Sequence, residues 1–265
     1  MSSGVDFTYA AERYDRVLVP GIFAPLAAAV ADAVEAAPGD RALDVACGTG
    51  ALTRVLAQRV GPDGEAIGAD PSEGMIAVAR ARDDGIEYVA AAADRLPFDD
   101  GRFTVVTCQQ GLQFTDDPAA ALRDLSRVSA PGGRLAVACW CDLEHDAGFL
   151  ALAQAADEHL GPDAGRAVRG PFRISDPGDL RGHLESAGID DVVVEIERVA
   201  ARVAVPPERF GEAVMTAGPA AAAYAAAPEQ ARQAFAAEVA RLLQPHSDGG
   251  AVVFEMPSLI AVARV

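Results

Sequence analysis

The sequence predicts an α/β protein whose mostly parallel sheet is covered by helices on both faces. Three observations predict this fold class. Short apolar runs alternate with segments of helical period through the first half of the chain. The first apolar run ends in a glycine-rich turn that leads straight into a helix. The chain has 265 residues, 51% of them hydrophobic, which suits one large domain with a substantial core. Strands that are linked through helices pair in parallel, so the sheet is expected to be doubly wound.

The elements of the first half are marked by local signals. Ser72 is a good N-cap, and Asp117-Pro118 combines a capping acceptor with proline at the first helical position. Four β-branched residues in a row, 104–107, favour a strand. The expected strands are 41–46, 65–69, 86–90, 103–108 and 134–140. The expected helices are 9–37 with a break near Pro20-Gly21, 51–60, 72–81 and 117–128.

The second half is less regular. Helices are expected over 149–160 and 179–187, and a strand over 192–203. A last strand is expected as two pieces, 251–255 and 259–265, around Pro257. Residues 206–245 are rich in alanine, which has the highest helix propensity, and they have a helical period. A helical insertion between two strands usually lies over one end of a sheet. We therefore weigh two interpretations of this segment: a lid over a ligand, or packing helices without ligand contact.

Composition excludes several classes of function. The chain has 22 basic and 39 acidic residues, a formal charge of −17, which disfavours partners with negative surfaces such as nucleic acids and anionic membranes. All basic residues are Arg, so lysine Schiff-base chemistry and the phosphate-binding lysine of P-loops are excluded. Four Cys do not make a disulfide scaffold. The first residues lack the apolar stretch of a signal peptide, and 22–37 is too interrupted to span a bilayer, so we expect a cytoplasmic protein.

The most informative segment is the turn after the first expected strand, residues 46–50, which reads ACGTG. Small residues let the backbone approach a ligand closely, and the helix that starts at Ala51 offers unpaired N–H groups. Asp70 ends the second expected strand, about 20 positions further along. A carboxylate at that place can accept hydrogen bonds from both hydroxyls of a ribose. The sequence therefore predicts a site for an adenosine-containing cofactor.

The turn lacks the third glycine of the nicotinamide and flavin pattern Gly-x-Gly-x-x-Gly. It resembles motif I of the class I S-adenosylmethionine-dependent methyltransferases, Asp-x-Gly-x-Gly-x-Gly, with Ala46 in place of the first glycine. Further segments are similar to the same family: 70–75 (DPSEGM), 91–98 (AAADRLPF), 103–114 (FTVVTCQQGLQF) and 131–135 (PGGRL). The resemblance covers 41–140, and the chain most resembles the ubiquinone/menaquinone-biosynthesis-like small-molecule methyltransferases. It implies a Rossmann-like sheet of seven strands, with an N-terminal helical segment and a helical insertion before the last strand.

The resemblance also implies roles for individual residues. The implied cofactor-binding residues are Tyr14, Asp44, Ala46, Gly48, Thr49, Gly50, Asp70, Met75, Ala92, Ala93, Asp94 and Gln109. Asp70 would hold the ribose, Met75 would flank the adenine and Gln109 would line the sulfur side. Tyr14 would close over the cofactor, or it packs as an ordinary core aromatic. The family often has Asp where this chain has Ala92, so the acidic contact with the adenine amine is lost, moved to Asp94 or made by backbone groups. The alternative for Asp94 is a surface carboxylate without a role.

The implied substrate-binding residues are Gln110, Leu112, Phe114 and Trp140. The alternative for Gln109 and Gln110 is capping of the strand end. A neutral or apolar acceptor is indicated by the apolar residues expected near the pocket mouth: Leu112, Phe114, Trp140, Phe149 and Phe172. His145 follows the fifth strand between two acids and is the candidate general base, or else an exposed loop histidine. Cys139, Cys141 and His145 could provide three zinc ligands, but a fourth ligand is not obvious, so no metal site is expected. A further alternative is a cluster of thiols at the cofactor, made by Cys47, Cys108 and one of Cys139 and Cys141.

The sequence therefore predicts methyl transfer from S-adenosylmethionine to a small molecule, with S-adenosylhomocysteine as product and oxygen preferred over nitrogen or carbon as acceptor. The alternative is a methyltransferase-like fold that uses the bound cofactor structurally for a cyclisation or isomerisation, and a cofactor-sensing module is a third possibility. We expect a single domain, 1–265, acting as a monomer or homodimer. Its expected parts are an N-terminal helical cap (1–38), a cofactor-binding core (39–142), substrate-side segments (143–205), a helical lid (206–250) and a last strand (251–265).

Overall fold

The computed structural model describes residues 7–83 and 85–265. The helices are α1 (Phe7–Val17), α2 (Ala24–Ala33), α3 (Ala51–Val60), α4 (Glu73–Arg82), α5 (Pro118–Val128), α6 (Ala147–His159), α7 (Pro162–Arg169), α8 (Pro177–Ser186), α9 (Pro207–Met215), α10 (Ala221–Ala226) and α11 (Glu229–Leu243). The strands are β1 (Arg41–Val45), β2 (Glu65–Asp70), β3 (Glu87–Ala90), β4 (Phe103–Gln109), β5 (Ser129–Trp140), β6 (Val193–Val203), β7 (Ser247–Asp248) and β8 (Ala251–Arg264). Short helical turns are η1 (Val19–Phe23, a π-helix), η2 (Leu112–Phe114), η3 (Leu143–His145), η4 (Gly170–Phe172) and η5 (Gln244–His246).

The strands form one mixed sheet in the order β3-β2-β1-β4-β5-β8-β6, and the two-residue β7 adds to β8. The first five strands of this order are parallel. β8 pairs antiparallel with β5, and β6 pairs antiparallel with β8, so β6 again runs in the direction of the first five. The chain runs outward from β1 to β3 and then returns to β4 on the other side of β1. The order therefore reverses between β1 and β4, where doubly wound sheets bind their ligands. The expected fold class is confirmed.

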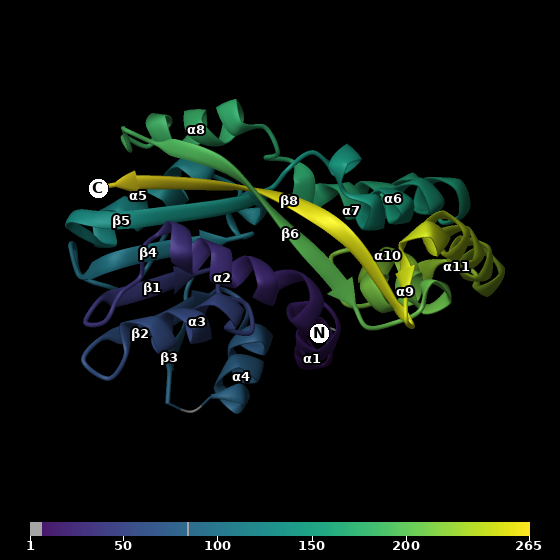
Figure 1. Ribbon diagram of the computed structural model, residues 1–265, viewed down its shortest axis with the longest axis horizontal. Helices are drawn as coiled ribbons and strands as arrows, with labels where there is room; N and C mark the ends of the chain where they lie inside the picture. The colour runs from purple at the N-terminus through teal and green to yellow at the C-terminus, as the bar shows by residue number, and fades with distance from the viewer. Residues whose placement is uncertain (1–6, 84) are drawn as a thin grey trace, which may run out of the picture.

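Both faces of the sheet are buried, as the apolar strand runs require. In β1, Ala42 packs on one face with Leu52 and Leu56 of α3, and its neighbour Leu43 packs on the other face with Leu122 of α5. α2 joins the first face, and α8 joins α5 on the second. Figure 1 shows α2 and α3 on one side of the strands and α5 and α8 on the other.

The second half of the chain builds a helical group at one end of the sheet. In Figure 1, the long strands β6 and β8 run beyond the parallel strands into α6, α7, α9, α10 and α11, while the C-terminus lies at the opposite end. These helices share one apolar core with α2 and α3, to which Phe210, Phe235 and Phe254 contribute. The Ala-rich segment is therefore ordered and helical.

Three elements differ from the expectations. α7 was not expected from the sequence, and β5 begins before the turn at 131–133. The last strand, expected as two pieces around Pro257, runs through the proline as the continuous β8, because β5 ends opposite Ser258. The Pro257 carbonyl accepts from the Cys141 N–H at 3.0 Å, just beyond the end of β5. The nitrogen of Pro257 points the same way as its carbonyl, so the proline lacks an N–H only where β5 has already ended.

In the part of the chain that the structure describes, no single helix is long and apolar enough to cross a membrane. Only Ala10–Val17 together with Val19–Ala33 pass that test by length and composition, and this pair is bent by 42°.

Candidate active site

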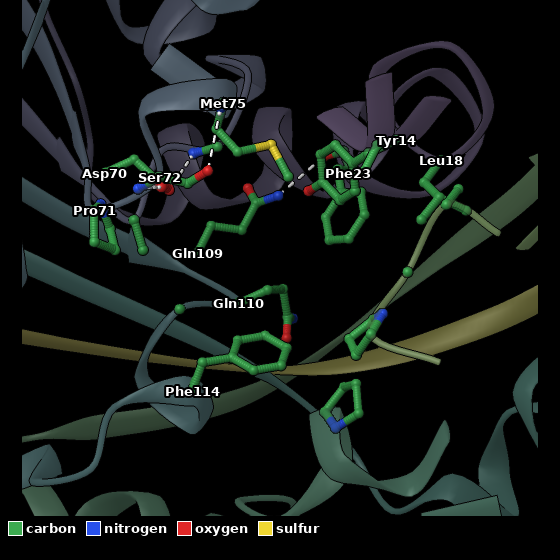
Figure 2. Close-up of a pocket in the computed structure, with 18 of the residues that line it drawn as sticks. Tyr14, Leu18, Phe23, Asp70, Pro71, Ser72, Met75, Gln109, Gln110 and Phe114 are labelled. Carbon is green, nitrogen blue, oxygen red and sulfur yellow. Dashed lines mark hydrogen bonds between the residues drawn. The ribbon is translucent and has the colours of Figure 1, made fainter. Parts of the chain in front are cut away.

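A cavity of about 650 Å³ opens where the parallel strands end. Its wall includes Ala46 after β1, Asp70 at the end of β2, Ala92 after β3, Gln109 at the end of β4 and Trp140 at the end of β5. Figure 2 shows Asp70, Ser72 and Met75 on one side of this cavity, and Tyr14, Leu18 and Phe23 on the other. The volume is in the range of small-molecule and cofactor sites.

Most of the residues singled out in the sequence lie in this wall. Those implied for the cofactor are Tyr14, Ala46, Gly48, Asp70, Met75, Ala92, Ala93, Asp94 and Gln109, and those implied for the substrate are Gln110, Phe114 and Trp140. Five others do not line it: Asp44, Thr49, Gly50, Leu112 and His145.

The turn after β1 depends on left-handed backbone at three positions. Ala46, Gly48 and Gly50 have φ of 57°, 56° and 83°. At Gly50 a Cβ would lie 2.4 Å from the Tyr88 hydroxyl oxygen, so only glycine fits. Ala46 keeps its side chain because Gly111 is opposite, where an added Cβ would lie 2.3 Å from the Ala46 Cβ. The departure from the family's glycine at position 46 is thus accommodated by a second glycine.

The Asp70 carboxylate is fixed by the turn it faces. It accepts hydrogen bonds from the Gly48 N–H at 2.9 Å and from the Ser72 N–H at 2.8 Å. Its side chain is only 8% exposed, and burial raises its pKa while the two backbone bonds lower it. Each carboxylate oxygen receives one of these bonds and retains a lone pair, so the group can accept two more bonds from the cavity side.

Asp44 corrects one expectation. Its carboxylate is buried beneath the turn rather than in the cavity wall, and it accepts from the hydroxyls of Thr53 at 2.7 Å and Thr107 at 3.1 Å. Burial raises the pKa of Asp44 to about 7 in spite of these two bonds. Thr49 and Gly50 also lie outside the wall. These three residues shape the turn from behind.

Leu112 and His145 require two further corrections. Leu112 is buried in the core against α5 and not in the cavity. His145 ends η3 with an exposed side chain outside the wall, so the expected general base is not brought to the site. Its neighbour Asp146 is the buried one: it caps α6 by accepting from the Phe149 N–H at 2.9 Å, and burial raises its pKa to about 7.

Helix α1 covers the half of the cavity that contains Asp70. The Tyr14 ring lies 5.0 Å from that of Phe23, and burial beside Asp70 raises the pKa of Tyr14 well above its usual value. α1 is anchored by an ion pair from buried Asp15 to Arg82 of α4. The Arg13 guanidinium also donates to the Thr216 hydroxyl at the end of α9, at 2.5 Å. This bond joins α1 to the lid candidate.

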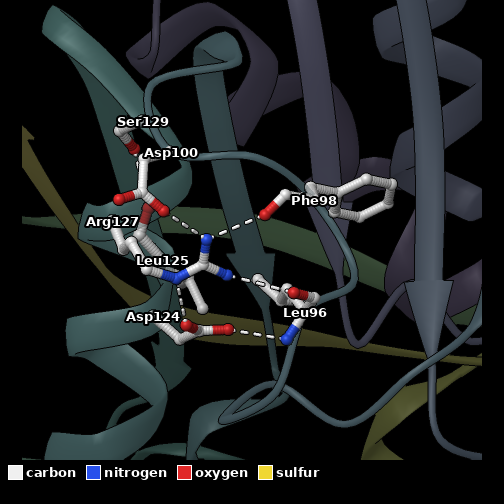
Figure 3. A network of polar contacts seen from close by, with 7 residues as sticks. All are labelled: Leu96, Phe98, Asp100, Asp124, Leu125, Arg127 and Ser129. Carbon is white, nitrogen blue, oxygen red and sulfur yellow. Dashed lines mark hydrogen bonds and ion pairs between the residues drawn. The ribbon is translucent and has the colours of Figure 1, made fainter.

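The loop that carries Ala92 and Asp94 is held from outside the cavity, as Figure 3 shows. The Leu96 N–H donates to Asp124 of α5 at 2.6 Å. The Arg127 guanidinium donates to the Leu96 and Phe98 carbonyls at 3.0 and 2.8 Å, and to Asp124. This network closes the loop against α5. Asp94 itself is exposed at the cavity rim.

The far half of the cavity is apolar. It is lined by Phe149 and Leu152 of α6, Val168 of α7, and Val214 and Met215 of α9. Residues 217–220, which follow α9, complete it. Phe172, expected near the mouth, is buried outside the wall. Sequence reasoning missed Phe23 and the residues of α7 and α9, for which helical periodicity signals burial but not a cavity.

The four cysteines are buried free thiols. Burial raises their pKa values, to about 12 for Cys108 and about 11 for Cys141, so they stay protonated near neutral pH. Among the described residues, no group of three or more His, Cys, Asp or Glu side chains could hold a metal ion.

The fold and the site define a class of protein: a doubly wound α/β domain with a buried carboxylate at the end of its second strand, in the wall of a cavity. A family model described as "Methyltransferase domain" matches residues 43–137. The ubiquinone/menaquinone biosynthesis C-methyltransferase UbiE of Ectopseudomonas mendocina is 47% identical over 106 residues, which are 38% of this chain and 41% of that protein. The chain spans less than half the length of the curated relatives it matches, 41% and 47% for two of them.

Solved structures show the fold. An S-adenosylmethionine-dependent methyltransferase from Thermotoga maritima aligns over 97% of both chains, with a TM-score of 0.55 and 19% identity. The cyclase SpnF aligns over 91% of this chain and 80% of its own, with a TM-score of 0.54 and 23% identity. Residues 43–137 therefore match a methyltransferase domain and are similar in sequence to the ubiquinone and menaquinone C-methyltransferases. The resemblance recognised in the sequence is confirmed.

Proposed function

We propose that this protein transfers a methyl group from S-adenosylmethionine to a small, mainly apolar molecule. The observation that carries the proposal is the Asp70 carboxylate, fixed by the Gly48 and Ser72 N–H groups in the wall of a cavity that continues into an apolar half. The matched methyltransferase domain supports it.

The residues present fit the cofactor. Asp70 would accept from the two ribose hydroxyls, and Met75 and the backbone at Ala92 and Ala93 would border the adenine. The Gly48 backbone leaves room for close approach in the methionine half. Gln109 is 9% exposed, and among the described residues its Oε1 has no hydrogen-bond partner, so this oxygen is available to the cofactor.

The bound cofactor supplies a methyl group that its sulfonium already activates. This chain's residues therefore have to hold the acceptor in line with that methyl group and exclude water. Tyr14, Phe23 and Trp140 would exclude water from the roof of the site. Of the described lining residues none is His, Lys or Arg, so we propose positioning and desolvation, without a histidine base, as the source of catalysis.

The acceptor atom is proposed to be carbon or oxygen. The sequence favoured oxygen, and the curated relatives are named C-methyltransferases. An uncharged acceptor follows from the apolar far half of the cavity. A nucleic-acid acceptor is disfavoured by the charge of −17.

Release of S-adenosylhomocysteine tests the proposal. The protein is incubated with S-adenosylmethionine and a panel of uncharged phenols, quinols and ketones, and each acceptor is also tested for binding. Product formation that needs Asp70 supports methyl transfer, and proton-carbon correlation NMR of the product identifies the methylated atom. If the cofactor and several acceptors bind but no S-adenosylhomocysteine forms, the proposal of methyl transfer to these acceptors is wrong. The alternative, in which the cofactor has a structural role, then gains support.

A further inference from the structure

Gln110 has an unusual position between the two halves of the cavity. It directly follows β4, its φ is 56°, and its N–H donates to the Ala138 carbonyl at 2.8 Å. A left-handed conformation in a residue other than glycine costs free energy, and such strain is concentrated at functional sites. This conformation turns the side chain toward the cavity on the side of Phe114 (Figure 2).

The Gln110 side chain carries a buried donor. It is only 6% exposed, and its Nε2 has no hydrogen-bond partner within residues 7–83 and 85–265. Its other atom is occupied, because Oε1 accepts from Gln113 Nε2 at 2.9 Å. A buried N–H group without a partner is costly. A ligand oxygen in the cavity would remove that cost.

Two further groups belong to the hydrogen-bonded chain that ends at Gln110. The Cys139 thiol donates to Gln113 Oε1 with a sulfur–oxygen distance of 3.6 Å. Gln113 must then present its Nε2 to Gln110, and Gln110 must present its Oε1 to Gln113. Gln113 and Cys139 are 2% and 0% exposed, so water does not compete for these bonds. In this arrangement the free atom of Gln110 is the Nε2 donor.

The neighbouring Gln109 has the opposite arrangement. Its Nε2 donates to the Phe23 carbonyl at 3.1 Å, and its Oε1 is the free atom. Two successive glutamines of the cavity wall thus carry one free acceptor and one free donor, both buried. Gln109 therefore provides a matched control for Gln110.

The surroundings of Gln110 limit the class of ligand. Charged groups in the described wall are Asp70 on the cofactor side and the exposed Asp94, Asp116 and Asp117 at the rim. None of them is a cation, so an anionic ligand would lack a counter-charge. The far half offers only apolar side chains next to the single free donor.

We propose that Gln110 is the specificity residue for the acceptor, and that the acceptor is an uncharged, mainly apolar molecule with a carbonyl, ether or hydroxyl oxygen that accepts from Gln110 Nε2. Gln113 and Cys139 are positioning residues that fix the orientation of the Gln110 amide. The assignment of this ligand as the methyl acceptor rests on the proposed function. The recognition of its oxygen rests on the geometry alone.

The test uses two aromatic probes of nearly equal shape. 2-Acetonaphthone has an accepting carbonyl, and 2-isopropylnaphthalene has a methyl group in its place. Their dissociation constants are measured by quenching of Trp140 fluorescence, with and without saturating S-adenosylhomocysteine. Gln110→Met should weaken ketone binding by about tenfold relative to the hydrocarbon, because it removes the donor but keeps the side-chain volume. Gln109→Met should leave the ratio of the two constants unchanged.

The positioning residues are tested by the same ratio. Gln113→Met and Cys139→Ala should each reduce the preference for the ketone, and Cys139→Ser, which keeps a donor, should retain it. A general loss of packing would weaken both probes equally and leave the ratio unmoved. An unchanged ratio in Gln110→Met, or failure of either probe to bind the wild type, would overturn the inference. If S-adenosylhomocysteine does not bind but the ratio still depends on Gln110, the proposed function is wrong and the recognition of an oxygen stands.

Discussion

When Asp44 is replaced by the neutral Asn, the free energy of unfolding of the variant minus that of the wild type should increase as the pH rises. The carboxyl is 1% exposed, and burial raises its pKa from 3.8 to about 7. A raised native pKa means that the native state holds a proton that the unfolded state has released. The stability linked to this proton is fully present below pH 4, decreases as the pH rises toward 7 and is lost above it.

The magnitude follows from the pKa difference. The slope is about 1.4 kcal/mol per pH unit between the two pKa values, so roughly 2.5 kcal/mol separates pH 5 from pH 8. Asp44→Asn keeps the shape and removes the titration; its amide oxygen can accept from one of the two threonine hydroxyls, and its amide nitrogen can donate to the other. The free energy of unfolding of Asp44→Asn minus that of the wild type should therefore rise by about 2.5 kcal/mol from pH 5 to pH 8.

Urea unfolding followed by tryptophan fluorescence measures this difference, since Trp140 is the one tryptophan in the sequence and is 4% exposed. Both proteins are measured without ligand at pH 5, 6, 7 and 8. The buried Asp146 titrates equally in both proteins and cancels in the comparison. A difference that stays constant within about 0.5 kcal/mol over this range would refute the reasoning.

Three more substitutions test how the cavity is held. Gly50→Ala should destabilise the protein by about 1–3 kcal/mol in urea unfolding, because its Cβ would lie 2.4 Å from the Tyr88 hydroxyl and its φ is 83°; an unchanged midpoint would contradict this. Arg127→Met frees the loop that is proposed to border the adenine, and calorimetry should find S-adenosylhomocysteine bound about threefold to tenfold more weakly; wild-type affinity would argue against the loop's role. Arg13→Met removes the bond to Thr216 and should speed dissociation of S-adenosylhomocysteine in stopped-flow measurements, and an unchanged rate would exclude a role for this bond in closing the site.

The sequence was sufficient to predict the elements that local chemistry determines. Ser72 and Asp117 cap helices where expected, accepting from Met75 N–H at 3.3 Å and Ala120 N–H at 2.9 Å. Asp70 reaches the cavity because β2 ends there, and strand ends can be predicted from the apolar pattern. These features depend on residues that are close together along the chain.

Features that depend on long-range packing could not be predicted. The positive φ of Gln110 turns the chain so that Gln110 faces the cavity and Leu112 enters the core, and nothing in the local pattern signals it. The direction of Asp44 depends on hydroxyls from α3 and β4. His145 and Asp146 are neighbours, yet the capping of α6 buries the acid and leaves the histidine outside.

The central claim is that Asp70 holds the ribose of S-adenosylmethionine. Titration calorimetry with S-adenosylhomocysteine measures it directly on the wild type, Asp70→Ala and the control Asp94→Ala. We predict micromolar binding that Asp70→Ala weakens by more than tenfold, which corresponds to about 1.4 kcal/mol, and that Asp94→Ala alters much less. Absence of binding to the wild type, or equal affinity for Asp70→Ala, would contradict the account.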